Sequence, residues 1–121
     1  MAFIADAAFD AALDYIRTNG TKIDICSSEP ASYAGISSVT LGNKTSMTLG
    51  ADANGATSGR KTQVPAITTG SVTGTGTATH WALSNGSSIL VATGALSASQ
   101  GVTSGNTFTL AAFDITFPDA T

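Results

Sequence analysis

The residues best suited to chemistry stand side by side in this sequence, which contains one histidine, His80, and one tryptophan, Trp81. An imidazole can act as a general acid or base, and an indole can stack on a sugar ring or a nucleobase. Adjacent residues of a β-strand point to opposite faces of the sheet, so these side chains cannot share one site on one face. A catalytic histidine also requires a nucleophile or an orienting carboxylate, and the sequence nominates neither. The pair therefore indicates a structural hairpin and not an active site.

The dipeptide Asn85-Gly86 predicts the turn of this hairpin, because both residues tolerate positive φ angles. With these two residues as the loop, Trp81 pairs with Leu90 on the returning strand. Trp81 then shares its face of the sheet with Leu83 and Leu90, which makes it an anchor of the core. We expect its side chain to be largely buried.

Acidic residues and a thiol are the remaining candidates for chemistry. Asp6, Asp10 and Asp14 recur at four-residue intervals, but no histidine or glutamate joins them, and such a row is usually a solvated helix face. The single cysteine, Cys26, excludes an internal disulfide and a multi-cysteine zinc site. The nearest cation on its strand face, Lys22, lies about 13 Å away along the strand, so we expect an inert, half-buried thiol. The sequence therefore predicts a protein that is not an enzyme and has no metal and no cofactor.

The composition limits the classes of partner. Charged residues make up 11% of the chain, against about 25% in an average soluble domain. Five basic residues and a net charge of −3 argue against a nucleic-acid binder, which needs clustered lysine and arginine. No apolar segment approaches the ~20 residues of a membrane span, and the N-terminal stretch lacks the pattern of a signal peptide. The surface of alanine, threonine, serine and glycine is easily desolvated against a neighbouring protein.

The spacing of apolar residues predicts one domain over residues 1–121, made of a helix in residues 1–20 and a β domain in residues 21–121. Phe9, Leu13 and Ile16 recur at helical spacing, and Asn19-Gly20 supplies a left-handed stop. The rest of the chain alternates with period two in seven or eight short antiparallel strands. This pattern predicts a mainly β fold, an antiparallel β-sandwich or barrel preceded by an N-terminal α-helix.

Individual strands follow from the alternation of apolar and polar residues. Residues 22–26 place two isoleucines on one face, and residues 71–84 read as one long strand rich in threonine. Residues 37–42 and 44–50, on either side of Asn43, read as two short strands. Pro65 places its strand at an edge or a bulge, because proline cannot donate to the ladder. In the last strand the apolar residues change from even to odd positions at Ala111-Ala112, which predicts a bulge or a sharp bend there.

Two segments are predicted to be irregular. Residues 27–35 read as a connection because Pro30 cannot continue a central strand, and residues 51–59, which hold no large apolar residue, read as an exposed loop. Long loops in compact domains are commonly functional. We therefore expect this loop and the N-terminus to contact a partner chain, through Phe3, Ile4, Ala51, Asp52, Asn54, Arg60 and Lys61.

Several stretches of the sequence resemble a family of small structural proteins of tailed bacteriophages. They include "DAALDYI", "GRKTQVPAI", "TGTATHWAL" and "ATGALSASQGVTSGNTFTLAAFDITFPD". The resemblance implies a place in the virion and carries over no catalytic residues. It favours a capsid decoration (cement) protein that forms homo-oligomers and binds the major capsid protein or other virion proteins.

Two alternatives to a decoration protein remain open. One is a component of the tail or of a head fibre, which the number of copies per virion would distinguish from a cement protein. The other is a carbohydrate-binding module for adsorption to the host, which should expose aromatic residues on one face. Tyr15 and Tyr33 are the only tyrosines and Trp81 is expected in the core, which disfavours the carbohydrate module.

Overall fold

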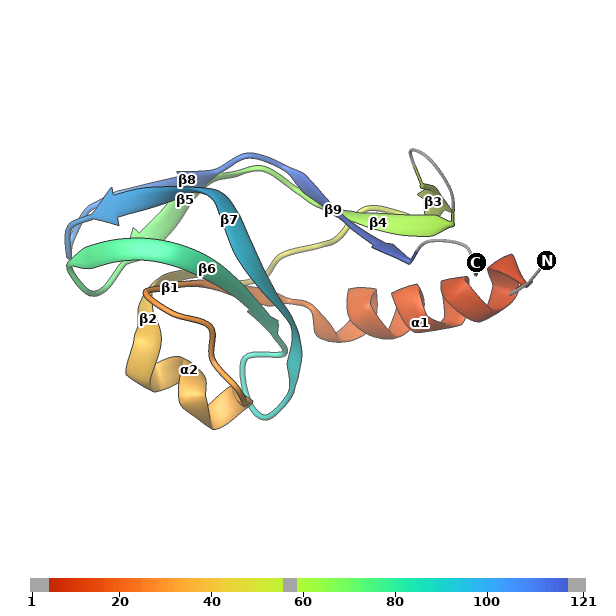
Figure 1. Cartoon of the computed structure of the whole chain (residues 1–121), viewed down its shortest axis with the longest axis horizontal. Helices are drawn as coiled ribbons and strands as arrows, with labels where there is room; N and C mark the ends of the chain where they lie inside the picture. The colour runs from red at the N-terminus through yellow and green to blue at the C-terminus, as the bar shows by residue number, and fades with distance from the viewer. Residues whose placement is uncertain (1–4, 56–58, 118–121) are drawn as a thin grey trace.

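A computed structural model describes residues 5–55 and 59–117 of the chain. Within these ranges the chain is mainly β, with a helix at its N-terminal end, as the sequence predicts (Figure 1). The elements in chain order are α1 (Asp6–Asn19), β1 (Lys22–Cys26), α2 (Tyr33–Val39), β2 (Thr40–Lys44), β3 (Ala53–Asn54), β4 (Arg60–Val64), β5 (Ile67–Val72), β6 (Gly76–Ser84), β7 (Leu90–Val102), β8 (Thr107–Leu110) and β9 (Phe113–Phe117).

The strands form two antiparallel sheets of unequal size. The larger sheet has six strands in the order β7-β6-β1-β2-β5-β8, and the smaller has three in the order β3-β4-β9. The larger sheet curls, so that β7 and β8, its two edges, come to the same side of the molecule (Figure 1). The smaller sheet extends away from it, and α1 runs alongside β4 and β9. In the described ranges no helix is both long and apolar enough to cross a bilayer.

The two sheets are joined by one continuous ribbon. Val64 pairs with Phe113 in the smaller sheet, and Ile67 pairs with Leu110 in the larger one. The register is the same on both sides of the gap between the sheets. Pro65 and Ala66 lie opposite Ala111 and Ala112, which separate β8 from β9. The irregularity predicted at Ala111-Ala112 is present as the break between β8 and β9, without a bulge because the register is unshifted across it, and Pro65 interrupts the partner strand at the same level.

Helix α1 packs on the smaller sheet through the face that its sequence predicts. Phe9, Leu13 and Ile16 are all buried, and the rings of Phe9 and Phe117 stack with centroids 6.2 Å apart. The predicted left-handed stop is wrong, since Gly20 has a φ of −84°. A glycine stands there because a Cβ would lie 2.6 Å from the carbonyl oxygen of Ile16, closer than packed atoms allow.

Strand β1 is buried on both faces, which the alternation within it did not predict. Ile23 and Ile25 lie in the main core inside the curled sheet, while Cys26 belongs to a second apolar cluster with Ile36 of α2. Helix α2 covers the outer face of β1 and forms this second cluster (Figure 1). Burial of both faces explains why Asp24, on the outer face, is only 1% exposed.

Three predictions about local structure are wrong. Residues 27–35 are not merely a connection, because the hydroxyl of Ser32 accepts a hydrogen bond from the Gly35 amide and starts α2. Residues 71–84 are not one strand, because β5 ends at Val72 and belongs beside β2 and β8, away from β6. Two short strands were predicted between residues 37 and 50, but only β2 forms.

The β6–β7 hairpin is wider than a two-residue turn. The Asn85 side-chain oxygen accepts hydrogen bonds from the amides of Ser87, Ser88 and Ile89. The amide of Asn85 also donates to the carbonyl oxygen of Ile89, so the loop runs from Asn85 to Ile89. The wider loop, together with a shift of register between Leu83 and Ser84, pairs Trp81 with Gly94 and not with Leu90 as predicted.

Candidate functional site at the open seam of the curled sheet

The outer edges of β7 and β8 face each other without pairing, and we call the gap between them the seam. Each edge strand has one neighbour in the larger sheet, β6 for β7 and β5 for β8. A cavity of about 650 Å³ fills the seam. Its walls are Trp81 of β6, residues 94–100 of β7 and residues 109–114 at the end of β8 and the start of β9.

Strand β7 bulges at the seam. Gln100 pairs with Ala78 and Ala95 pairs with His80, so residues 96–99 have no partners in the register with β6. The Gln100 side-chain amide crosses the seam and donates to the carbonyl oxygen of Thr109 at 3.0 Å. The backbone of residues 96–99 is thus displaced from one neighbour and lies along the cavity.

The aromatic wall of the seam consists of two rings. Trp81 and Phe113 have ring centroids 4.8 Å apart and are tilted by 40°. Both side chains are partly buried and pack against the main core. Trp81, which the sequence predicts as an anchor of the core, is partly buried and contacts the main core, and its indole also lines the seam. The wider hairpin and a shift of register between Leu83 and Ser84 together place glycine and not leucine opposite it.

His80 does not line the seam cavity. Its Nδ1 lies 2.9 Å from the hydroxyl of Thr79, its neighbour in β6. The seam is lined by a single charged side chain, Asp114, whose carboxylate pairs with Lys61 at 3.0 Å. Across residues 5–55 and 59–117, three or more His, Cys, Asp or Glu side chains nowhere gather closely enough to hold a metal ion.

The predicted contact residue Arg60 is engaged inside the chain. Its guanidinium donates to both carboxylate oxygens of Asp10, at 2.8 and 3.2 Å, and to the Asn54 side-chain oxygen at 2.8 Å. These bonds fasten the β3–β4 hairpin to α1. Arg60 and Asn54 are thus already hydrogen-bonded at this junction. Lys61, the next residue of β4, points to the other face of the smaller sheet and donates to Asp114.

The predicted exposed loop is partly a strand. Ala51 is exposed, and Asp52 lies against α1 with an oxygen 3.8 Å from the Arg17 guanidinium. Burial raises the pKa of Asp52, and the neighbouring Asp14 carboxylate raises it further. Phe3 and Ile4 lie outside the described residues. Ala51, Asp52, Asn54 and Arg60 therefore surround the junction of α1 with the smaller sheet, whereas Lys61 pairs with Asp114, which lines the seam.

The sequence reading missed the seam itself. Its residues come mainly from β7 and from the break between β8 and β9, which the curl of the larger sheet brings together only in the folded chain. The signal in the sequence was the length of β7, 13 residues, with small side chains through its second half. Protein-family models, curated proteins and solved structures were all compared with the chain, and none of them matches it.

Proposed function

We propose that this chain is a non-enzymatic structural protein of a tailed-bacteriophage virion, a capsid decoration protein whose seam binds an extended segment of a neighbouring virion protein. The observation that carries the proposal is that both edges of the seam are unprotected. Strand β7 has no charged residue and no proline from Leu90 to Val102, and β8 has none from Thr107 to Leu110.

Unprotected edges are uncommon in isolated proteins. A sheet edge presents free N–H and C=O groups to any passing strand, and proteins normally block it with lysine, proline or a covering element. Keeping two such edges on one side of a molecule fits a protein that meets its partner there. In a virion, the partner is the major capsid protein, another virion protein or a second copy of this chain.

The seam has the features of a site for strand addition. An added strand gains affinity from main-chain hydrogen bonds along the edge and specificity from pockets that take its side chains. Here residues 96–99 of β7 supply the backbone, and the cavity beside Trp81 and Phe113 supplies a pocket for an apolar side chain. Repetition of the contact over a lattice adds avidity to a modest single affinity.

Counting copies in purified particles of the phage that encodes the chain tests the virion role. Quantitative mass spectrometry should find the chain in proportion to the major capsid protein. A copy number far below that of the capsid protein would indicate a component of the tail or of a fibre instead of a decoration protein. Absence from the particles would overturn the proposal.

A charge placed on the β7 edge tests the seam. Ala98 is exposed within the bulge, so Ala98→Lys should leave the melting temperature nearly unchanged and reduce occupancy on particles that lack the protein. Ser87→Lys places the same charge at the exposed β6–β7 turn and serves as the matched control. Equal occupancy of both variants and the parent chain would show that the seam is not the contact.

A further inference from the structure

A second, polar pocket lies on the outer face of the curled sheet, between α2 and strands β1 and β2. Its volume is about 230 Å³. Drug-sized ligands occupy pockets of about 300–1,000 Å³, so this one has the size of a smaller molecule. Its polar walls are Lys22, Asp24, Tyr33, Ser37, Thr40 and Asn43.

Asp24 is the unusual group in this pocket. It is 1% exposed, and one carboxylate oxygen, Oδ2, accepts a hydrogen bond of 2.7 Å from the Thr40 hydroxyl. The other oxygen, Oδ1, is buried and has no hydrogen-bond partner among residues 5–55 and 59–117. The Lys22 ammonium lies 3.9 Å from Oδ1, beyond hydrogen-bond distance. Buried carboxylate oxygens are nearly always hydrogen-bonded, so this one can accept a donor that the chain does not supply.

The charges around Asp24 select the class of ligand. A free cation would meet the Lys22 ammonium, and an anion would meet the Asp24 carboxylate. A neutral molecule with hydroxyl groups satisfies both, since a hydroxyl donates to Oδ1 and accepts from an ammonium or an amide N–H. Asn43 is the cross-strand partner of Asp24 and adds an amide, and Tyr33 adds an aromatic wall.

We propose that this pocket binds one neutral sugar unit, whose hydroxyl donates to Asp24 Oδ1 while Lys22 and Asn43 donate to its oxygens. The sugar ring packs against Tyr33 of α2. The flexible Lys22 side chain, which is 26% exposed, moves aside to admit the hydroxyl. The inference does not rest on the virion role, because it uses only groups on β1, β2 and α2, none of which lines the seam cavity.

The test is a titration of the full, isotopically labelled chain with D-glucose, D-galactose and N-acetyl-D-glucosamine, followed by amide chemical shifts. At least one sugar should shift the amides of β1, β2 and α2 with millimolar affinity. Asp24→Asn keeps the shape and an acceptor for Thr40, and it should weaken binding by about tenfold or more. Tyr33→Ala should weaken it as well, whereas Asp6→Asn, which removes an exposed carboxylate of α1, should not.

Three outcomes would overturn the inference. The first is that none of the sugars shifts the pocket amides. The second is that the shifts persist unchanged in Asp24→Asn, although its spectrum shows a folded chain. The third is that the shifts map to the seam around Trp81. An equal response of the pocket amides to ethylammonium chloride would mark a cation site and also count against a sugar.

Discussion

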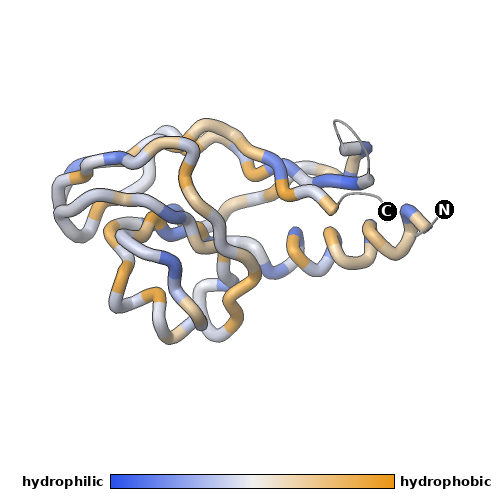
Figure 2. The backbone as a smooth tube through the Cα atoms, viewed as in Figure 1, coloured by the Kyte–Doolittle hydropathy of each residue, from blue (hydrophilic) through white to orange (hydrophobic). Residues whose placement is uncertain are grey.

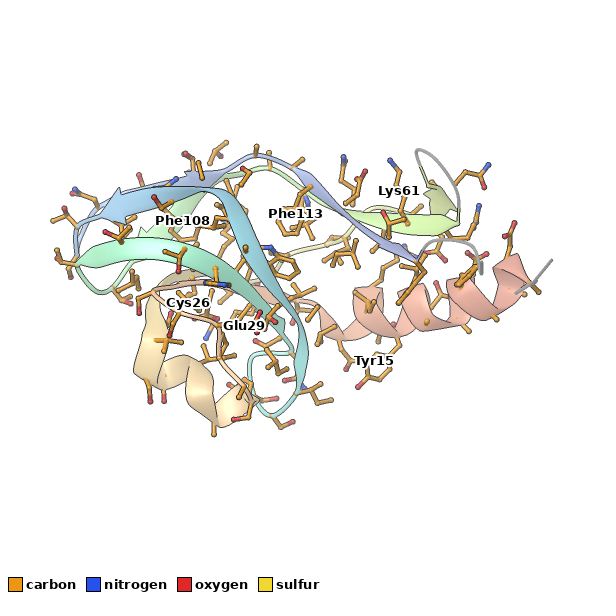
Figure 3. The ribbon with its side chains drawn as sticks, viewed as in Figure 1. Tyr15, Cys26, Glu29, Lys61, Phe108 and Phe113 are labelled. Atoms are coloured by element: carbon orange, nitrogen blue, oxygen red, sulfur yellow. The ribbon has the colours of Figure 1, made fainter. Side chains whose placement is uncertain are left out.

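Gly94 of β7 lies directly against the indole of Trp81, its partner in β6. A Cβ at this position would come 2.7 Å from Cζ2 and 2.8 Å from Nε1 of the indole. The ring therefore keeps its place between the core and the seam only because residue 94 has no side chain. Figure 3 labels Phe113, the other ring of the pair, which is the first residue of β9.

Gly94→Ala should destabilise the fold and displace the indole. Overpacking of this kind costs typically about 1–3 kcal/mol. Urea unfolding measures the loss, and tryptophan fluorescence should change in the folded state. Gly101→Ala is the matched control in the same strand, because a Cβ there meets nothing within 4 Å. Equal stability of the two variants would show that the indole is free to move.

The Asp10–Arg60 pair should couple α1 to the smaller sheet. The pair makes two hydrogen bonds, and the side chains are only 32% and 18% exposed. A double-mutant cycle with alanine should give a favourable coupling free energy between the two side chains. The Lys61–Asp114 pair, with one hydrogen bond, should give less. A coupling for Lys61–Asp114 as large as that for Asp10–Arg60 would contradict this ranking.

The Cys26 thiol should be inert in the folded protein. Burial raises its pKa to about 12, and the Asp24 carboxylate adds to the effect. The thiolate is the reactive form, so a disulfide reagent at mildly alkaline pH should react about a thousandfold more slowly than with the unfolded chain. Reaction at the rate of a free thiol without denaturant would show that the second apolar cluster opens readily.

Folding stability should increase as the pH falls from neutral to mildly acidic values. Burial raises the pKa of Asp24 above its ordinary 3.8, against the opposing effects of Thr40 and Lys22. The folded chain then binds this proton more tightly than the unfolded chain, so stability is lost as the pH rises through the raised pKa. The pKa of Asp52 is also raised, so this residue changes the folding stability with pH in the same direction.

Urea unfolding at several pH values measures this dependence. Asp24→Asn should flatten the curve between mildly acidic and neutral pH, because an amide does not titrate there. Asp52→Asn should remove a further part. If the free energy of unfolding of the parent chain falls toward acidic pH, or if Asp24→Asn leaves its pH dependence unchanged, the Asp24 carboxylate is charged and well solvated in the folded state.

A separate feature of α1 concerns the surface. Tyr15 is 54% exposed and, in the described ranges, it is the one large apolar side chain in that state. It points away from the smaller sheet (Figure 3). The helix carries hydrophilic stretches between its apolar ones (Figure 2), which include Asp10, Asp14 and Arg17. Tyr15→Ser should therefore leave the stability within about 0.5 kcal/mol of the parent chain, as measured by urea unfolding. A larger loss would reveal a packing role for the ring.

The sequence by itself determined the features that depend on neighbours along the chain. The spacing of Phe9, Leu13 and Ile16 fixes which face of α1 is buried, because the period of a helix is the same wherever it packs. The slip of alternation at Ala111-Ala112 marks the change from one sheet to the other, because each sheet buries its own face of the ribbon.

Only the tertiary structure decided the features that join distant segments. The side chain of Asn85 holds the wide hairpin loop, and this loop and the register shift between Leu83 and Ser84 place Gly94 beside Trp81. Helix α2 buries Asp24, on a face of β1 that alternation alone marks as polar. The sequence predicts that Arg60 contacts a partner chain, but in the folded chain α1 places Asp10 beside it and the two side chains are hydrogen-bonded. Hydrogen bonds and burial of this kind depend on three-dimensional distances, which local periodicity does not encode.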